Sequence, residues 1–470
     1  MSVLFVSDVI RYLLSFIFTV YIARYLGTEG FGLLSFVVAS MGILGVVIDL
    51  GINSLMVRDI AVNKELTAKY VGNVLLIKTF LSLAIFGTLF AILALGTYPS
   101  ETVYVSLFIG LSVIVSSFTG IFTAVFQSHQ KMQYQAIGEI SRNVLMLVGA
   151  FLIISLQDNI VMLASSYLYV NLAVFIYSVV IVLWRFTRPK IEVDWVFWKQ
   201  IFRNSLPIGG MAIFFLIYFR IDTVMLSFMK GDVAVGLYNA AYRLIDATLV
   251  IPTIVTTAMF PVLAHYHASN RGLFLNVYEK SFKFLLFLGL LMAVVVTLLS
   301  SQIIGIVFGD AFLESAGALQ ILIWASAALF LSSILGSVFI AANMQMVGLY
   351  INFITIFINV ALNLLIIPSY GFIGASITTV ISEIINIIIC LYYLEKHGYH
   401  LGLKTVFLPA IIGLALIGGI IVVLSMVGIS MVIIAAVSLV LYGLILFKFG
   451  IDKQDLLMLR KIFTIKKHNE

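Results

Sequence analysis

The sequence predicts an all-α membrane protein that crosses the bilayer about fourteen times, and three observations lead to this class. Between Lys404 and Lys448, 43 consecutive residues include no Asp, Glu, Lys or Arg. Of the 470 residues, 62% are hydrophobic and only 10% are charged, and the mean hydropathy is +1.17. The apolar runs are continuous and about 20 to 28 residues long, which suits helices across a hydrocarbon core about 30 Å thick rather than alternating barrel strands.

Glycine, proline and charge clusters divide the chain into the expected spans. We expect helices at residues 2–25, 31–56, 70–97, 101–128, 136–156, 159–185, 205–230, 232–263, 274–300, 314–343, 345–367, 371–395, 404–426 and 428–448. Some connections are very short, such as residues 157–159. Such connections leave no room for a soluble domain, so any chemistry lies within the membrane or at its surface.

Five regions follow from this division. They are an N-terminal six-helix bundle (1–186), an interfacial linker on the cytoplasmic side (187–204), a C-terminal six-helix bundle (205–397), helices thirteen and fourteen (398–448) and a basic cytoplasmic tail (449–470). The linker contains Trp195 and Trp198, and the amphipathic indole ring favours the membrane interface.

The distribution of Lys and Arg predicts the orientation, because these residues stay on the cytoplasmic side in short loops. With the N-terminus inside, 21 Lys and Arg residues are assigned to the inner loops and the tail, Arg142 among them. Only Arg24 and Lys230 are assigned to outer loops. Both termini are therefore expected on the cytoplasmic side. The expected location is the plasma or inner membrane of the cell. The net charge of +6 reflects this topology, and a nucleic-acid partner is not expected.

Two similar pairs of segments suggest an internal duplication. Residues 25–35, between spans one and two, resemble residues 229–239, between spans seven and eight, and the segments are 204 positions apart. Residues 130–132 similarly resemble residues 344–346. A shift of six spans preserves the orientation in the membrane, so the two bundles are expected to be parallel repeats.

Nine ionisable residues are singled out within the expected spans, where each is costly and normally faces protein or water. They are Asp8, Arg11, Asp49, Lys78, Arg220, Asp222, Arg243, Asp246 and Glu383. Seven of the nine lie in spans one, two, seven and eight, which are equivalent elements of the two bundles. This uneven distribution indicates a polar cavity lined by those four spans.

Four cationic residues of these spans could bind a phosphate, since the forked guanidinium group matches phosphate geometry. They are Arg11, Lys78, Arg220 and Arg243. An alternative role is structural, because Asp8, Asp222 and Asp246 each lie two or three residues from one of the arginines and could neutralise it. Lys78 could also extend to the cytoplasmic interface, and Asp49 and Glu383 could serve polar helix packing.

A family resemblance rests on short motifs whose order is specific. Residues 23–32 (ARYLGTEGFG) follow the first span, Asp49-Leu50-Gly51 ends the second, and Asp222 precedes residues 236–241 (GLYNAA). Together with the number of spans, these motifs resemble polysaccharide flippases of the multidrug/oligosaccharidyl-lipid/polysaccharide exporter superfamily over essentially the whole chain.

The resemblance implies two six-helix bundles, with spans one, two, seven and eight lining the cavity. It implies a substrate that is an oligosaccharide linked to polyprenyl phosphate or pyrophosphate, moved from the cytoplasmic to the outer leaflet. By the same resemblance Arg11, Arg24, Arg220 and Arg243 are expected to contact the headgroup. Membrane lipids and the glycosyltransferases or polymerase of the same pathway are the implied partners, and no cofactor is expected.

Three alternatives stay open on the sequence alone. A peptidoglycan-precursor flippase would fit the number of spans and the basic cavity. A drug or cation antiporter of the same superfamily would favour an acidic cavity and twelve spans. A membrane-embedded polymerase or ligase would need a large outer loop with catalytic residues, whereas the longest outer connection, about residues 301–313, is short. No catalytic triad, phosphate loop or metal-ligand spacing is found in the sequence, so a transporter is favoured over an enzyme.

Overall fold

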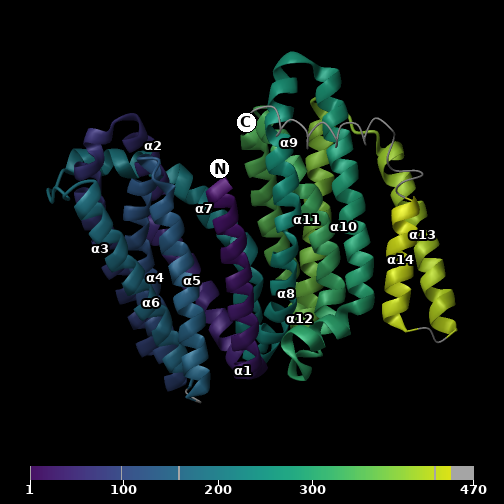
Figure 1. Cartoon of the computed structure of the whole chain (residues 1–470), viewed down its shortest axis with the longest axis horizontal. Coiled ribbons are helices and arrows are strands. Elements are labelled where there is room, and N and C mark those ends of the chain that lie inside the picture. The colour runs from purple at the N-terminus through teal and green to yellow at the C-terminus, as the bar shows by residue number, and fades with distance from the viewer. Residues whose placement is uncertain (1, 97, 157–158, 428–429, 446–470) are drawn as a thin grey trace. The chain divides into compact units, whose positions relative to one another are not determined.

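The computed structural model describes residues 2–96, 98–156, 159–427 and 430–445. Within these ranges every regular element is a helix, which confirms the predicted all-α class (Figure 1). The chain divides into two compact units, Met1–Asn239 and Ala240–Glu470, and each is described by itself. The five predicted regions, whose bounds differ from these units, stay a prediction.

The first unit contains seven complete helices and the start of an eighth among its described residues. They are α1 (Ser2–Asp49), α2 (Ile52–Val62), α3 (Thr67–Leu95), α4 (Ser100–Ser128), α5 (Met132–Ser155), α6 (Ile160–Arg185), α7 (Trp195–Lys230) and the first half of α8 (Asp232–Thr248). Helices α4 and α6 pack closely together, and α1 packs against α4, α5 and α7. The helices surround two clusters of buried apolar side chains, one of which includes Ile52, Val125 and Ile201.

The second unit contains the remaining described helices. They are the end of α8, α9 (Val250–Ser269), α10 (Arg271–Phe308), α11 (Ser315–Ala341), α12 (Gln345–Lys396), α13 (Leu403–Met426) and α14 (Met431–Ile445). Helix α11 packs against α9, α10 and α12, while α13 and α14 pack on each other and on α10 (Figure 1). The predicted basic tail lies outside the described residues.

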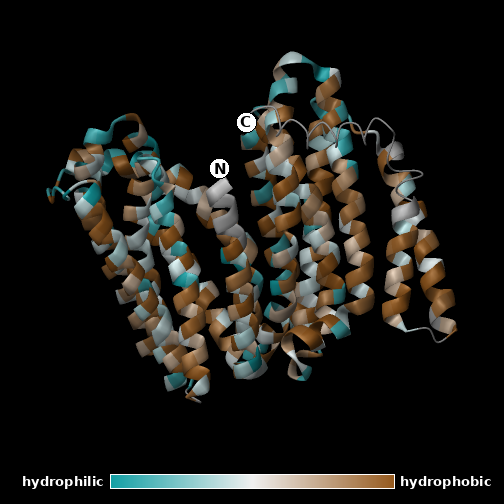
Figure 2. Ribbon diagram, in the orientation of Figure 1, coloured by the Kyte–Doolittle hydropathy of each residue, from teal (hydrophilic) through white to brown (hydrophobic). Residues whose placement is uncertain are grey.

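Eleven stretches of the described chain are long and apolar enough to cross a membrane, and a shorter apolar helix covers Met431–Tyr442. Two of the eleven are 53 and 52 residues long, and each contains a glycine with non-helical backbone angles, Gly27 in α1 and Gly371 in α12. Hydrophobic residues cover most of the helical surface in both units (Figure 2). The polytopic membrane class is confirmed, and the number of fourteen spans stays a prediction.

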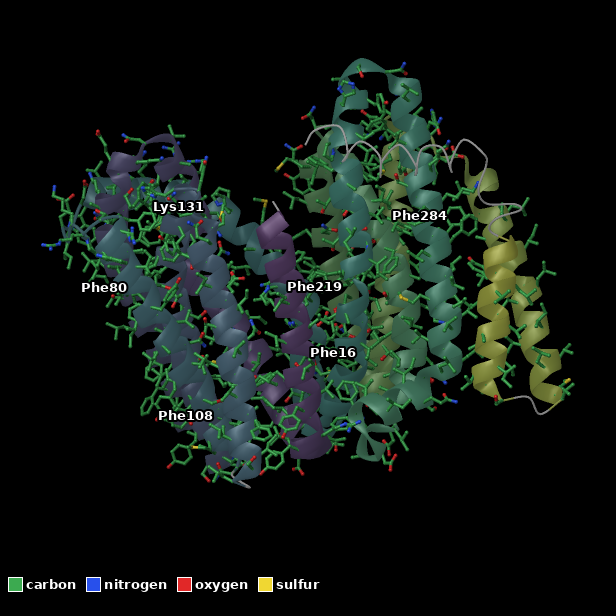
Figure 3. All side chains as sticks on the ribbon, viewed as in Figure 1. Phe16, Phe80, Phe108, Lys131, Phe219 and Phe284 are labelled. Carbon is green, nitrogen blue, oxygen red and sulfur yellow. The ribbon has the colours of Figure 1, made fainter. Side chains whose placement is uncertain are left out.

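Large apolar side chains project from the outer faces of the helices, as a lipid environment allows. Phe80 on the outer side of α3 is one example, with 61% of its surface exposed (Figure 3). In a water-soluble protein a continuous exposed apolar surface of this kind would be a liability.

The backbone at two glycines agrees with the predicted internal duplication. Gly27 has φ 68° and ψ −173°, and Gly231, 204 positions later, has φ 79° and ψ −178°. Two tight turns also match, because Gln130 (φ 57°) and Asn343 (φ 58°) adopt the same left-handed conformation. When the two turns are aligned, Lys131 corresponds to Met344, one residue before Gln345, with which sequence similarity had paired it.

The segment before α7 is fixed to α3. The Lys190 N–H donates to the Ala68 carbonyl over 3.0 Å, and a Cβ on Gly72 would lie 1.9 Å from the Lys190 carbonyl oxygen, so only glycine allows this approach. Asn73 Oδ1 accepts a 2.7 Å hydrogen bond from Trp198 Nε1, and Lys69 forms a 2.7 Å ion pair with Asp194. The predicted linker is therefore an ordered part of the first unit.

Candidate functional site

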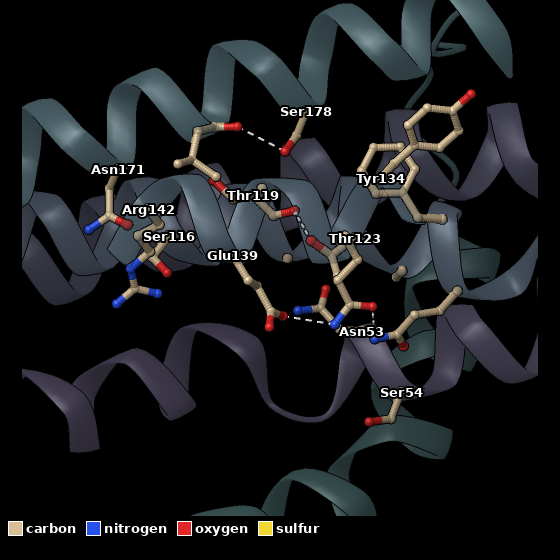
Figure 4. Close-up of a pocket in the computed structure, with 17 residues that line it drawn as sticks. Asn53, Ser54, Ser116, Thr119, Thr123, Tyr134, Glu139, Arg142, Asn171 and Ser178 are labelled. Carbon is tan, nitrogen blue, oxygen red and sulfur yellow. Dashed lines mark hydrogen bonds between the residues drawn. The ribbon is translucent and has the colours of Figure 1, made fainter. Parts of the chain in front are cut away.

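A polar pocket lies among the membrane-spanning helices of the first unit (Figure 4). Its volume is about 340 Å³, near the lower end of the range of about 300 to 1,000 Å³ that is typical of small-molecule sites. Helices α2, α4, α5 and α6 line it. The lining residues are Asn53, Ser54, Ser116, Thr119, Gly120, Thr123, Ala124, Phe126, Gln127, Tyr134, Gln135, Gly138, Glu139, Arg142, Asn171, Val174 and Ser178.

Helix α5 supplies one polar stripe of this pocket. Its lining residues are Tyr134, Gln135, Gly138, Glu139 and Arg142. Steps of one, three, one and three residues keep side chains on the same face of a helix with 3.6 residues per turn. The rest of α5 remains apolar enough for a membrane span, so the stripe turns inward toward the pocket.

A chain of side-chain amides holds the single carboxylate of the pocket lining in place. Gln127 Nε2 donates to Gln135 Oε1 over 3.1 Å, and Gln135 Nε2 donates to Glu139 Oε1 over 2.8 Å (Figure 4). The other Glu139 oxygen lies 3.9 Å from Arg11 Nε, which forms a loose ion pair with it. Each carboxylate oxygen thus faces a donor, so Glu139 stays oriented.

Arg142 lines the pocket, and its side chain is exposed. The guanidinium lies at the same end of the pocket as Ser116 and Asn171 (Figure 4). An arginine at the centre of a helix costs about 2.5 to 3.5 kcal/mol on membrane-insertion scales. A position inside a helix and beside a pocket indicates a functional group.

Lys78 is completely buried, and all three of its ammonium protons have acceptors. Nζ donates to Asp49 Oδ1 over 2.8 Å, to Asn53 Oδ1 over 3.0 Å and to the Ser117 carbonyl over 2.9 Å. Lys78 therefore connects four helices, and its side chain does not extend to the interface. Its predicted role in phosphate binding stays a proposal, because in this conformation the ammonium group is saturated.

The break between α1 and α2 places two of these acceptors. Leu50 (φ 43°) and Gly51 (φ 75°) adopt left-handed conformations that end one helix and begin the next. Asp49 before the break and Asn53 after it both accept a hydrogen bond from Lys78. Asn53 also lines the pocket, and so it joins the buried ion pair to the pocket wall.

The remaining predicted residues of the first unit are distributed along α1 and α7. Arg11 faces Glu139, as described above, whereas Arg24 is exposed near the end of the first arm of α1. Arg220 is half-buried in α7, and the buried Asp222 accepts a 3.0 Å hydrogen bond from the Tyr238 hydroxyl. Asp8 lies in the described helix α1, but its side chain lies outside the described residues.

Arg243 and Asp246 belong to the second unit. Arg243 Nη1 lies 3.9 Å from Asp246 Oδ2, one helical turn away, which agrees with the structural alternative of an ion pair. Arg220 lies in the other unit, and the convergence of the two arginines on one ligand stays a prediction.

Sequence analysis missed Glu139 and Arg142. It assigned Arg142 to the cytoplasmic loops, but the structure places the residue ten positions after the start of α5, or about 15 Å along the helix axis. The spacing of the polar residues from Tyr134 to Arg142 was the signal that could have identified this face of the helix.

An all-helical, polytopic membrane fold with a polar pocket inside its helices defines a transporter architecture rather than a soluble binding protein. Residues 1–267 match the family described as "Polysaccharide biosynthesis protein", and the chain belongs to this family. Residues 207–365 also match the MatE family.

Two curated relatives align with most of the chain. The "Probable low-salt glycan biosynthesis flippase Agl15" of Haloferax volcanii is 22% identical over 408 residues, which cover 84% of this chain and 82% of the relative. The "Capsular polysaccharide biosynthesis protein CapF" of Staphylococcus aureus is 21% identical over 402 residues, which cover 84% of this chain and 98% of that protein.

Solved structures show the same fold. The inward closed conformation of the lipid II flippase MurJ has a TM-score of 0.76 at 16% identity, with 94% of this chain and 98% of that chain covered. An inward-facing multidrug resistance MATE family transporter of the MOP superfamily has a TM-score of 0.66 at 15% identity, with 82% and 94% covered. The fold of the superfamily that the sequence motifs suggested is confirmed.

Proposed function

We propose that this protein is a flippase that moves an oligosaccharide linked to polyprenyl phosphate or pyrophosphate from the cytoplasmic to the outer leaflet, for cell-surface polysaccharide biosynthesis. The observation that carries the proposal is the pocket of the first unit, in a chain of the polysaccharide biosynthesis family. Amides, hydroxyls, one carboxylate and one guanidinium line it, together with the aromatic ring of Tyr134. These groups can donate to and accept from sugar hydroxyls within an apolar bundle.

Transport requires that the polar headgroup avoid the hydrocarbon core while the prenyl tail stays in it. A pocket between the helices gives the sugars hydrogen-bond partners at a depth where water is absent, and the apolar outer faces leave the tail in lipid. Alternating access between two conformations would then expose the pocket to one side at a time.

Four arginines are proposed for the phosphate groups: Arg11, Arg24, Arg220 and Arg243, with Lys78 as a further cation. Asp8, Asp49, Asp222 and Asp246 are proposed as cavity or ion-pair partners. The cell membrane location, the two cytoplasmic termini and the association with glycosyltransferases or a polymerase of the same pathway are part of the same proposal. The role is that of a transporter and not of an enzyme.

A lipid II flippase is the second candidate, and the fold similarity to MurJ favours it over the antiporter alternative. The guanidinium groups of Arg142 and Arg11 also fit an anionic substrate better than a drug cation.

Flipping of a fluorescent polyprenyl-pyrophosphate oligosaccharide in proteoliposomes tests the proposal. We expect the wild type to move the lipid, and Arg220→Ala or Arg243→Ala to stop it while the protein stays folded. Normal movement in both variants would assign these arginines to structural ion pairs. Failure of the wild type to move this lipid, with export of an organic cation instead, would refute the proposal in favour of an antiporter.

A further inference from the structure

Arg142 is the feature of the pocket that neither packing nor ion pairing accounts for. Among the described residues, no hydrogen bond or ion pair joins its guanidinium to another side chain or carbonyl, although Glu139 lies one helical turn before it on α5. Glu139 is instead held by Gln135 and faces Arg11. The five N–H donors of Arg142 are therefore available on the pocket side.

The polar groups near Arg142 are positioned to bind a ligand rather than to hydrogen-bond with the arginine. Asn171 is buried, and its Nδ2 donates to Ser112 Oγ over 2.6 Å and to the Tyr167 carbonyl over 3.0 Å. Both amide protons are thus used within α4 and α6, which fixes the amide group with its carbonyl oxygen as the remaining acceptor. A fixed acceptor and a guanidinium at one end of the pocket can bind a group that bears both an acid and a hydroxyl.

The charge balance indicates one negative charge on the ligand. Glu139 and Arg142 are the charged residues among those that line the pocket, and Glu139 is held by Gln135 and faces Arg11, so the charge of Arg142 is the one left for a ligand. A carboxylate carries one negative charge, which matches one guanidinium group, whereas the pyrophosphate linkage of a prenyl carrier carries about two and would need a second cation. The volume of about 340 Å³ accommodates about one or two sugar rings and not a whole oligosaccharide.

We infer that this pocket binds a sugar residue that carries a carboxylate, a uronic acid type of unit, with Arg142 as the group that recognises the carboxylate. The inference rests on the proposed function and specifies its substrate. Arg142 would make a forked pair of hydrogen bonds to the carboxylate, and the amide and hydroxyl groups of α2, α4 and α6 would bind the ring hydroxyls. The phosphates of the carrier would bind elsewhere.

The test compares three synthetic prenyl-pyrophosphate lipids in proteoliposomes. One carries a disaccharide that ends in glucuronate, the second carries the same disaccharide ending in glucose, and the third carries no sugar. Glucuronate and glucose differ only in the carboxylate that replaces the hydroxymethyl group. Titration of the two soluble disaccharides into the purified protein gives a second measurement that does not depend on transport.

Three variants accompany the wild type. Arg142→Gln removes the charge, and Arg142→Lys keeps the charge but loses the fork. Arg185→Gln is the matched control, because Arg185 lies in the last turn of α6, outside the pocket, where its guanidinium stacks 4.1 Å from the Trp184 ring. Size-exclusion chromatography establishes which variants are folded.

We expect the wild type to bind and move the glucuronate lipid in preference to the glucose lipid. Arg142→Gln should weaken binding and transport of the glucuronate substrate by about tenfold or more, because it removes hydrogen bonds between charged groups. Binding and transport of the glucose substrate should change little. Arg142→Lys should be intermediate, and Arg185→Gln should behave like the wild type.

If Arg142→Gln reduced the transport of all three lipids equally, the inference would be overturned and Arg142 would be assigned to the pyrophosphate. A wild type that does not distinguish glucuronate from glucose would overturn it whether or not the variants fold. If the wild type moves none of the lipids, the proposed function fails. The soluble disaccharides then test the inference separately. If the wild type binds the glucuronate disaccharide and Arg142→Gln does not, the carboxylate site is supported. If the wild type does not bind it, the carboxylate site is refuted.

Discussion

Gly32 and Gly236, 204 positions apart in the sequence, pack backbone against backbone within the first unit. A Cβ on Gly32 would lie 1.8 Å from the Asp232 carbonyl oxygen and 2.9 Å from the Gly236 nitrogen, and a Cβ on Gly236 would lie 2.0 Å from the Thr28 carbonyl oxygen. The two residues occupy equivalent places in the predicted repeat. The two segments that the sequence suggested as repeats thus meet at these glycines, where small residues allow helices in a membrane to approach closely.

We predict that Gly32→Ala and Gly236→Ala each prevent correct folding or destabilise the protein strongly. Overpacking typically costs about 1 to 3 kcal/mol, and here the added methyl group meets backbone that cannot rotate away. Thermal unfolding of the purified variants measures the effect. Gly87→Ala on α3 is the control, since its Cβ would have no neighbour within 4 Å. Equal melting temperatures for all three variants would contradict the close crossing.

The Lys78–Asp49 pair supports a second prediction. Lys78→Met should destabilise the first unit by about 3 to 5 kcal/mol, because it leaves a carboxylate without its cation inside the bundle. The double variant Lys78→Met/Asp49→Asn should recover much of this loss, as both charges are then gone. Melting temperatures of the single and double variants measure the recovery. A stable Lys78→Met protein that no longer transports would instead support Lys78 as a substrate ligand.

Gly120 provides a test of the pocket wall. A Cβ at this position would lie 2.4 Å from Asn53 Nδ2, and Asn53 cannot move freely because its Oδ1 is bound to Lys78. Gly120→Ala should therefore displace the amide and reduce transport roughly tenfold or more, as small misplacements in a site do. Gly149→Ala in α5, where the nearest atom would be 3.7 Å away, should leave transport unchanged. A fully active Gly120→Ala protein would exclude Asn53 from the site.

The contact between the linker and α3 gives a prediction on pH. The hydrogen bond from Lys69 and the Phe197 N–H lower the pKa of Asp194 below its ordinary value of 3.8. A lowered pKa in the folded state means that the ionised form stabilises the fold at neutral pH, and that this contribution is lost as the pH falls below 3.8 toward the lowered value. Asp194→Asn should therefore lower the melting temperature at pH 7 but not at acidic pH, as scanning fluorimetry across the pH range would measure. The same decrease at every pH would mean that the charge of Asp194 plays no part.

Much of the fold could be predicted because the membrane limits the possible structures. Continuous apolar runs have to be helices, and the glycines at positions 27 and 231 had matching sequence surroundings that now have matching backbone angles. Arg11 and Asp49 are two of the ionisable residues that the sequence placed inside the expected spans, and both are half-buried in the structure. They lie close to the pocket of the first unit, as ion-pair partners of Glu139 and Lys78.

The rest of the site depends on how each helix is rotated about its axis, and a hydropathy pattern does not specify this rotation. Lys78 on α3 and Asp49 at the end of α1 are 29 residues apart, and a hydropathy pattern does not show that their side chains face each other. Arg142 was assigned to a loop because charge near the end of a span is normally topological. The expected span 136–156 already contained Arg142, but a hydropathy pattern does not show which face of α5 lines the pocket.

The ordered connection between α6 and α7 has a practical consequence for protein engineering. Long polar segments between membrane helices are the usual places to insert an epitope for an antibody fragment or a fluorescent reporter. In this protein the Lys190 backbone fits against Gly72, and Trp198 and Asp194 both bond to Asn73. An insertion there would separate the chain from α3, so the turn between α4 and α5 near the exposed Lys131 is the better insertion point (Figure 3).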